Sequence, residues 1–139
     1  MSPASRARAL LEISKAATIY FAIVFGFGLV FGTIRVLLMV PRFGERVTEL
    51  IETPFMLIAI IFGALIIKRF CVARRLVAVG SGVVALGLLV LAEIEFVMRL
   101  RGLTVSQYIA TRDPVSGAAY LMMLVVFALM PWFVVRSTR

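Results

Sequence analysis

Residues 16–40 read AATIYFAIVFGFGLVFGTIRVLLMV, a run in which Arg35 is the only charged residue. The hydrocarbon core of a bilayer is about 30 Å thick, and a helix needs roughly 20 mostly apolar residues to span it. Only helices and closed barrels satisfy their backbone hydrogen bonds in lipid, and this run is too long and too uniformly apolar for a barrel strand. It therefore predicts a transmembrane helix.

Three more apolar segments meet the same criterion or nearly do. The predicted helices cover about 16–40, 45–68, 76–98 and 114–135, within a single membrane domain of residues 1–139. The connections between them are short, so neighbouring helices should be antiparallel. We expect an all-α fold, an integral membrane four-helix up-down bundle.

The composition excludes several classes of protein. Of the 139 residues, 63% are hydrophobic and 16% are charged, and the mean hydropathy is +1.09. A soluble domain of this size cannot bury so much apolar surface, so a soluble enzyme is excluded. The single cysteine excludes a disulfide-rich secreted domain, and the lack of histidine removes the commonest metal ligand and general base. We predict no catalytic residue, no cofactor and no metal site.

The first apolar run has an alternative interpretation as a secretory signal. Arg6, Arg8 and Lys15 precede it, as basic residues do in such signals. The run is too long for a signal and lacks a small-residue cleavage site, so we interpret it as a membrane anchor.

Charged residues near the helix ends predict the orientation. In a chain with four crossings, one side holds the N-terminus, the second connection and the C-terminus, with nine cations against Glu12 alone. The other side holds six cations and six acids. The positive-inside rule then places both termini in the cytoplasm, and a bacterial inner membrane is the expected location. The same distribution explains the pI of about 11.1, so nucleic acid is not an expected partner.

Arg35 lies on a stripe of small residues in the first predicted helix. Gly28 and Gly32 form a GxxxG step, which allows helices to approach closely, and Arg35 follows three residues later. We expect the two glycines at a helix-packing interface and Arg35 pointing into that interface. The alternative is that the Arg35 side chain extends along the helix to the lipid headgroups.

Acidic residues cluster at the start of the second predicted helix. Glu45, Glu49 and Glu52 lie within about 60° of one another on a helix that turns 100° per residue. Pro54 either kinks this helix or lies in its first turn. Glu49 and Glu52 should lie near the outer mouth of the bundle, whereas Glu45 fits a solvated helix surface.

Two acids near the end of the third predicted helix face different ways. Glu93 and Glu95 are separated by about 200° around the helix. Glu95 lies on the stripe of small residues, so we predict it as the buried partner of Arg35. Glu93 should point elsewhere, toward Arg46 or Arg101, a second interface or a partner subunit.

The segment before the fourth predicted helix carries two helix-start signals. Residues 104–107 match a capping box that opens a short helix through Ile109. Asp113 followed by Pro114 matches an N-cap and a proline in the first helical position. Tyr120 lies two turns inside the fourth helix, where a buried hydroxyl needs a hydrogen-bond partner.

These placements predict a polar site in the outer third of the bundle. Its predicted members are Arg35, Glu49, Glu52, Glu95, Arg99 and Tyr120. The secondary candidates are Glu93, Asp113 and Arg46. Ionisable residues inside a span usually face protein or water, so the site should open to the outer face or to the outer leaflet.

Three short segments resemble a known kind of membrane protein. Residues 32–35 (GTIR), 41–45 (PRFGE) and 49–54 (ELIETP) resemble small four-helix proteins of bacterial inner membranes that have no assigned activity. The resemblance covers mainly the first half of the chain. It implies a bacterial inner-membrane protein and no particular activity.

Three function classes fit these observations. We expect first an accessory or assembly subunit whose charges fold the bundle and dock a larger membrane partner, because balanced charges indicate internal pairing. The alternative is a homo-oligomeric binding or transport protein for an anionic or amphiphilic ligand. A further alternative is a small membrane enzyme on a lipid substrate, with a glutamate as acid or base. The expected partners are the lipid bilayer and either further copies of the chain or a larger membrane complex.

Overall fold

The computed structural model describes residues 2–70, 74–102, 104, 106–107, 110 and 113–137. Its elements are α1 (Pro3–Ile34), η1 (Arg35–Met39, a π-helix), α2 (Val40–Phe43), α3 (Glu45–Phe70), α4 (Arg75–Arg101) and α6 (Pro114–Ser137). No strand occurs among the residues so described. The predicted all-α class is therefore confirmed.

Four helical stretches are long enough and apolar enough to cross a membrane. They are Pro3–Phe43, Glu45–Arg69, Arg75–Phe96 and Gly117–Arg136. Each overlaps one of the four apolar runs in the sequence, which confirms the prediction of four long apolar helices.

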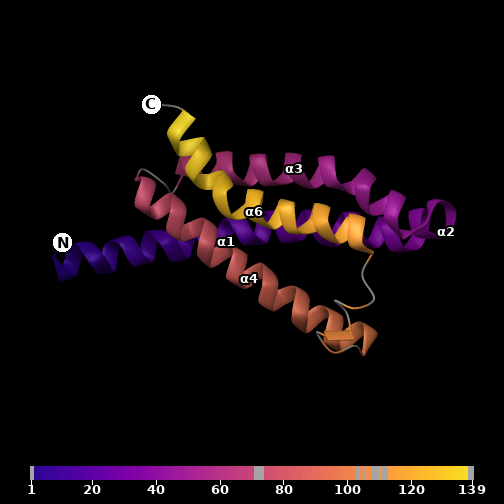
Figure 1. Ribbon diagram of the computed structural model, residues 1–139. Helices are drawn as coiled ribbons and strands as arrows, with labels where there is room; N and C mark the ends of the chain where they lie inside the picture. Colours follow the sequence, from indigo (N-terminus) through magenta and orange to yellow (C-terminus); the bar gives the residue numbers. More distant parts are fainter. Residues whose placement is uncertain are drawn as a thin grey trace.

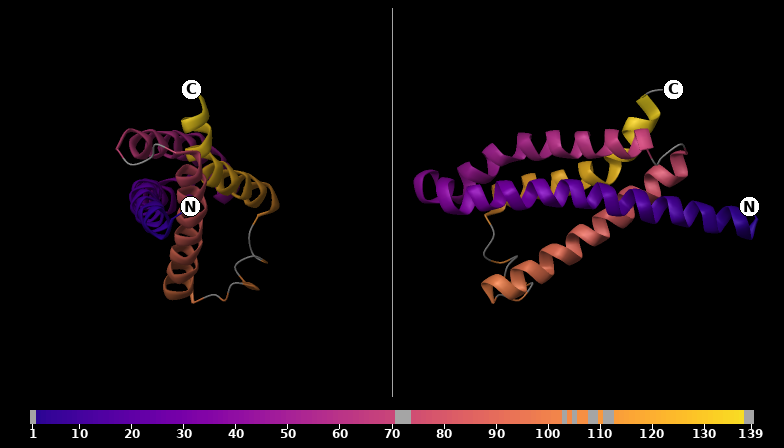
Figure 2. Two further views of the ribbon diagram at one scale, coloured as in Figure 1. Left: turned by 90° about the vertical axis from the view of Figure 1, so that its left-hand side faces the viewer. Right: turned by 180° about the vertical axis from the view of Figure 1, so that it is seen from behind.

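The long helices alternate in direction along the chain (Figure 1). α1 contacts α3 and α4, and α6 contacts the same two helices. The start of α1, the end of α3, the start of α4 and the end of α6 lie at one end of the molecule, which we call the terminal end, whereas α2 lies at the opposite end (Figure 1). α4 crosses the other helices obliquely and diverges from them toward its C-terminus (Figure 2).

α1 begins at Pro3, well before the predicted start at Ala16. The Oγ of Ser2 accepts a hydrogen bond of 3.2 Å from the backbone N–H of Ser5, and a proline follows the cap. A serine cap followed by proline is a strong helix start, and the next residues are good helix formers. The first turns of α1 extend beyond the other helices (Figure 2).

The helix changes character where it reaches Pro41. Proline has no N–H and its ring clashes with the carbonyl four residues earlier, here that of Leu37. The chain widens into a π-turn just before this point, and the N–H of Val40 bonds to the carbonyl of Arg35. π-Turns inside α-helices are frequent at functional sites. This one places Arg35 at its first position.

Gly44 reverses the chain between α2 and α3. Its φ of 83° and ψ of 165° lie in a region that is essentially restricted to glycine. The carbonyl of Gly44 accepts a 2.6 Å hydrogen bond from the Oγ1 of Thr48, a buried residue. α3 therefore begins directly at Glu45, so Pro54 lies inside the helix and not in its first turn.

The buried apolar side chains of the four long helices form one core cluster. They include Ala16, Ala17, Tyr20, Ile60, Ala64, Ile67, Val77, Ala78, Ala85, Phe127 and Val134. Glycines allow the closest contacts there. A Cβ at Gly82 would overlap the carbonyl oxygen of Ala128, and one at Gly63 would lie 3.1 Å from a ring carbon of Tyr20.

Tyr20 joins α1 to α6 inside this core. Its hydroxyl donates a 2.6 Å hydrogen bond to the carbonyl of Phe127, and the two rings stack with centroids 4.5 Å apart. In a regular helix that carbonyl accepts from the N–H of residue 131, which here is a proline without one. The Tyr20 hydroxyl supplies the hydrogen bond that Pro131 cannot.

Candidate functional site

A cavity of about 510 Å³ occupies the half of the molecule nearest α2. Its lining comes from all four long helices and η1, including Val24, Gly32, Glu52, Leu89 and Tyr120. From Val24 to Arg35 it runs roughly 16 Å along α1, at 1.5 Å per residue. The volume lies within the range of about 300–1,000 Å³ typical of small-molecule sites.

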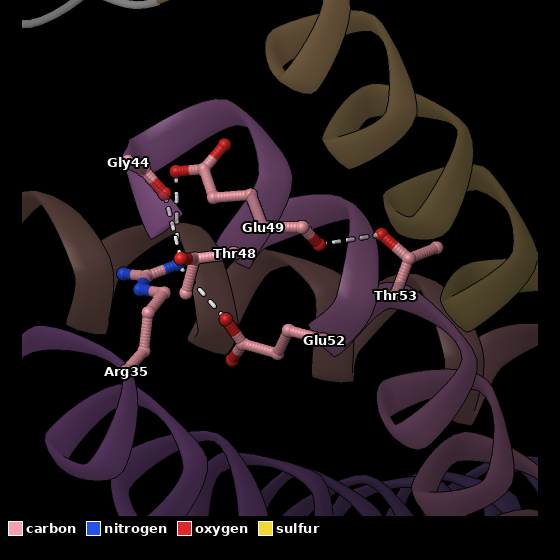
Figure 3. A network of polar contacts seen from close by, with 6 residues as sticks. All are labelled: Arg35, Gly44, Thr48, Glu49, Glu52 and Thr53. Atoms are coloured by element: carbon pink, nitrogen blue, oxygen red, sulfur yellow. Dashed lines mark hydrogen bonds and ion pairs between the residues drawn. The ribbon is translucent and has the colours of Figure 1, made fainter. Parts of the chain in front are cut away.

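The charged part of the cavity centres on Arg35. Its Nη1 lies 3.0 Å from Oε2 of Glu52 and 3.6 Å from Oε1 of Glu49. The side chains of Arg35, Glu52 and Glu49 are 27%, 14% and 11% exposed, so water screens these pairs only partly. Figure 3 shows the guanidinium between the two carboxylates.

The geometry of this cluster follows from the turn that precedes it. η1 presents Arg35 and the reversal at Gly44 brings the start of α3 back beside it. The Oγ1 of Thr53 donates a 2.9 Å hydrogen bond to the carbonyl of Glu49, and Thr48 bonds to Gly44 in the same way (Figure 3). The two threonines were not among the predicted site residues. A threonine within a helix is nevertheless a recognisable signal, because its hydroxyl can bond to the carbonyl four residues earlier.

The rest of the cavity is apolar and rich in aromatic side chains. Phe25 of α1, Phe96 of α4 and Phe127 of α6 line it, together with Met56 and Ile60 of α3. Phe127 is also the residue whose carbonyl accepts the hydrogen bond from Tyr20 in the core. The cavity thus has a charged end near α2 and an apolar end that reaches the core.

Two further predicted residues line the same cavity. Tyr120 contributes from α6 and Glu93 from α4, alongside Arg35, Glu49 and Glu52. Glu93 was expected to point away from this cluster, toward Arg46 or Arg101 or another interface. The structure instead makes it part of the lining, and the side chain of Arg101 lies outside the described part of the chain.

The predicted pairing of Arg35 with Glu95 is wrong. Glu95 accepts a 3.0 Å hydrogen bond from Nε of Arg99, and these two side chains are 66% and 82% exposed. The buried positions of α4 include Ser81, Ala85 and Leu89, at steps of four. Rows at i±4 drift slowly around a helix, and this row continues to residue 93 rather than 95. Glu52 is the close partner of Arg35 instead.

The helix-packing role predicted for Gly28 and Gly32 is also corrected. Both glycines line the cavity. A Cβ at Gly28 would meet only Met56 at 3.7 Å, an ordinary contact, and one at Gly32 would meet nothing within 4 Å. The close helix contacts lie instead at Gly63, Gly80 and Gly82.

The secondary candidates Arg46 and Asp113 join the starts of α3 and α6. Nε and Nη2 of Arg46 donate to both carboxylate oxygens of Asp113, with a shortest distance of 2.7 Å. The carbonyl of Asp113 also accepts from the N–H of Gly117, as expected for a residue at a helix start. This bidentate pair fixes one end of α6 against α3.

The capping box predicted before α6 is confirmed where the structure describes it. The N–H of Thr104 donates to Oε1 of Gln107 at 3.1 Å, and the N–H of Gln107 donates to Oγ1 of Thr104 at 3.3 Å. These are the two reciprocal bonds of the motif. The predicted end of this short helix, Ile109, lies outside the described residues.

The site combines a held guanidinium, several carboxylates and an apolar chamber. Such an arrangement can bind a molecule with one charged and one apolar part. Within the described residues, no group of three or more histidine, cysteine, aspartate or glutamate side chains could hold a metal ion. Comparisons with protein-family models, with characterised proteins and with solved structures find no match to this chain.

Proposed function

We propose that this chain is a multi-pass protein of a bacterial inner membrane, which it crosses four times as an up-down bundle. The four long apolar helices support this, as does the outward exposure of large apolar side chains such as Leu37, Ile58 and Met122. An apolar surface this extensive needs lipid around it. The resemblance of residues 32–35, 41–45 and 49–54 to small four-helix proteins of bacterial inner membranes also supports this proposal.

In this proposal the terminal end faces the cytoplasm. Basic residues lie there on the start of α1, the end of α3, the start of α4 and the end of α6, including Arg6, Lys68, Arg75 and Arg136. The positive-inside rule assigns such an end to the cytoplasm. The charged end of the cavity then lies toward the outer leaflet.

The function that the cavity supports best is binding of an amphiphilic ligand within the membrane. The observation that carries this is a chamber of about 510 Å³ with charged residues at one end and aromatic and aliphatic residues at the other. Charged groups inside a span are costly, and they usually mark ligand or ion sites. A cluster that served folding alone would not require an open chamber beside it.

A role as an accessory or assembly subunit is the second candidate. It is favoured by ion pairs that link separate helices within one chain, Arg35 with Glu52 and Arg46 with Asp113. Such pairs can set the register of helices even where they add little stability. In this case a larger membrane complex, or further copies of the chain, would be the partner.

Two leucine substitutions on α1 separate these candidates. Gly32→Leu places an apolar side chain in the cavity, whereas a Cβ at Gly26, on the same helix and outside the lining, also meets nothing within 4 Å. Both changes replace glycine by leucine inside the same helix, so the change in helix propensity is the same. Gly26→Leu is therefore a matched control.

The measurement is the amphiphile that remains bound after purification in mild detergent, identified and counted by mass spectrometry. We expect the wild type and Gly26→Leu to retain a bound amphiphile and Gly32→Leu to lose it. Equal occupancy in all three proteins would contradict ligand binding in the cavity. If a protein partner co-purifies with the wild type and with both variants, and none of the three retains an amphiphile, the result would favour the accessory role.

A further inference from the structure

We propose a second binding site, a pocket at the terminal end that takes a phosphate group, carried by an acidic phospholipid or by a soluble phosphate ester. The pocket has a volume of about 230 Å³ and lies between the start of α1 and the residue that precedes α4. Its lining includes Ser2, Ser5, Arg8, Ala9, Glu12 and Arg74. It shares no lining residue with the cavity described above, so it is a separate site.

The pocket lies just beyond the point where α1 and α4 pack closely. A Cβ at Gly80 would lie 2.8 Å from Cδ1 of Ile13, so no side chain fits between the two helices there. The lining residues come before Ile13 in α1 and before Gly80 in α4. Among them, Ala9 is only 8% exposed although it belongs to the first turns of α1. The helices therefore enclose a space on the side of this contact where both begin.

The two arginines of the pocket are available to a ligand. Within the part of the chain that the structure describes, the side chains of Arg8 and Arg74 form no hydrogen bond or ion pair. Both are exposed, whereas the guanidinium of Arg35 is held by carboxylates. A guanidinium matches the oxygens of a phosphate group in a bidentate manner. Two of them, from separate elements, can therefore hold one phosphate group.

Acidic side chains do not cancel this positive charge. The chain has seven acidic residues, and all of them belong to the described part. Glu12 is the one at the terminal end, and it offsets one of the two guanidiniums in the lining. The other six lie on α3, near the end of α4 and before α6: Glu45, Glu49, Glu52, Glu93, Glu95 and Asp113. A net positive charge therefore remains at the pocket, and it attracts an anion.

The size and the remaining polar group of the pocket also suit a phosphate group. A water molecule takes about 30 Å³, so the pocket has the volume of roughly seven waters, enough for one phosphorus and four oxygen atoms. The Oγ of Ser2 accepts a hydrogen bond from the N–H of Ser5, and the Oγ of Ser5 donates to the carbonyl of Ser2. The hydroxyl hydrogen of Ser2 has no acceptor among the described residues, so it can donate to a phosphate oxygen.

Exposed leucines beside the arginines favour a lipid as the source of the phosphate. Leu10 and Leu11 of α1 and Leu76 of α4 are 64%, 72% and 62% exposed. Exposed leucines among basic residues are typical of a helix at a membrane interface, where apolar side chains reach acyl chains and basic ones reach headgroups. In the proposed orientation this interface is the cytoplasmic leaflet, which carries anionic lipids. An acidic phospholipid is therefore the expected ligand.

Two double variants with the same loss of charge test the pocket. Arg8→Gln with Arg74→Gln, the pocket double, removes both lining guanidiniums. Arg6→Gln with Arg75→Gln, the control double, removes neighbouring arginines that do not line the pocket. All four arginines are exposed, so neither double should alter the fold. Phosphatidylglycerol is titrated into each full chain in uncharged detergent at about 0.1 M salt, which screens charges beyond about 10 Å.

Bound lipid is counted by native mass spectrometry. A lipid held in the larger cavity counts equally in both doubles, so the difference between them reports the pocket. Phosphatidylcholine with the same acyl chains is the second probe, because its own ammonium group neutralises its phosphate. Glycerol phosphate, measured by equilibrium dialysis, is the soluble probe.

We expect the pocket double to need at least about tenfold more phosphatidylglycerol than the control double for the same occupancy, since charge-assisted contacts are lost. Phosphatidylcholine should bind the wild type at least about tenfold more weakly than phosphatidylglycerol does. Glu12→Gln should tighten binding of phosphatidylglycerol, because a lining carboxylate that repels the phosphate is removed. A variant that failed to fold would not bind more tightly, so this change tests the site independently of the arginine variants.

Equal binding of phosphatidylglycerol to the two doubles overturns the pocket, because the lipid then responds to net charge or to none of these arginines. Equal binding of the two lipids to the wild type also overturns it. Binding of glycerol phosphate that only the pocket double loses, without tighter binding of phosphatidylglycerol, assigns the pocket to a soluble phosphate ester. Tighter binding of phosphatidylglycerol assigns it to the lipid. Ligand binding in the larger cavity is measured separately with Gly32→Leu, so either proposal can fail alone.

Discussion

Replacing Tyr20 by phenylalanine should lower the free energy of unfolding by about 1–3 kcal/mol, the cost of leaving a buried carbonyl without its hydrogen bond. The hydroxyl of Tyr20 lies 2.6 Å from the carbonyl of Phe127. The ring remains in the variant, so its stacking on Phe127, at 4.5 Å between centroids, is retained. The loss therefore isolates the hydrogen bond from the packing.

The reasoning is tested by combining this change with Pro131→Ala. Alanine restores an N–H at position 131, which can donate to the carbonyl of Phe127 in the ordinary helical pattern. Tyr20→Phe should then cost less than about 0.5 kcal/mol, a coupling of at least about 0.5 kcal/mol between the two sites. Pro131 is itself buried, and the double-mutant cycle subtracts any packing change that its replacement causes.

The control is Pro54→Ala in α3. The carbonyl four residues before Pro54 belongs to Leu50, so this change and Tyr20→Phe should be additive. Unfolding is followed by circular dichroism as sodium dodecyl sulfate is added to mixed micelles. If Tyr20→Phe costs the same with proline as with alanine at position 131, then Tyr20 does not replace the missing N–H and the argument is refuted.

Two further predictions concern the charged cluster and the turn that builds it. Gly44→Ala should destabilise the chain by about 1–3 kcal/mol, because φ of 83° with ψ of 165° strains any residue with a Cβ. Thermal unfolding measures the loss of stability. A loss no larger than that of Gly32→Ala would contradict the prediction. Glu52→Ala should cost about 1–3 kcal/mol, whereas Glu95→Ala should cost about 0.5 kcal/mol or less, because the exposed pair with Arg99 is screened by water. The same unfolding assay compares the two variants, and an equal or reversed order would contradict the role of Glu52 as the partner that stabilises Arg35.

The four helices could be predicted from the sequence because hydropathy is a local and additive property. A run of about 20 apolar residues meets the length requirement of a spanning helix wherever its neighbours lie. Local signals also placed the capping box at residues 104–107 and the helix start after Asp113. The start of α1 was placed too late, since the polar residues before Ala16 carry no hydropathy signal although they form helix readily.

The candidate site could be predicted only in part. Arg35, Glu49 and Glu52 could be identified because charged residues in or beside an apolar span are costly and usually face protein or water. The predicted partner of Arg35 was wrong. Gly28 and Gly32, predicted at a helix-packing interface, line the cavity instead. Small residues in a helix permit close packing without requiring it, and a wheel projection does not say which neighbour faces each stripe.

Local patterns were enough to locate the long helices, the basic terminal end and most charged members of the cluster. Tertiary packing alone determined that Glu52, and not Glu95, pairs with Arg35. It also determined that Gly28 and Gly32 of α1 line a cavity. The reason is that these contacts depend on the π-turn, on the reversal at Gly44 and on the oblique path of α4 (Figure 2). The π-turn and the reversal at Gly44 set the angle between α1 and α3, and the path of α4 sets which of its faces lines the cavity. The hydropathy of a stretch of sequence encodes none of these angles.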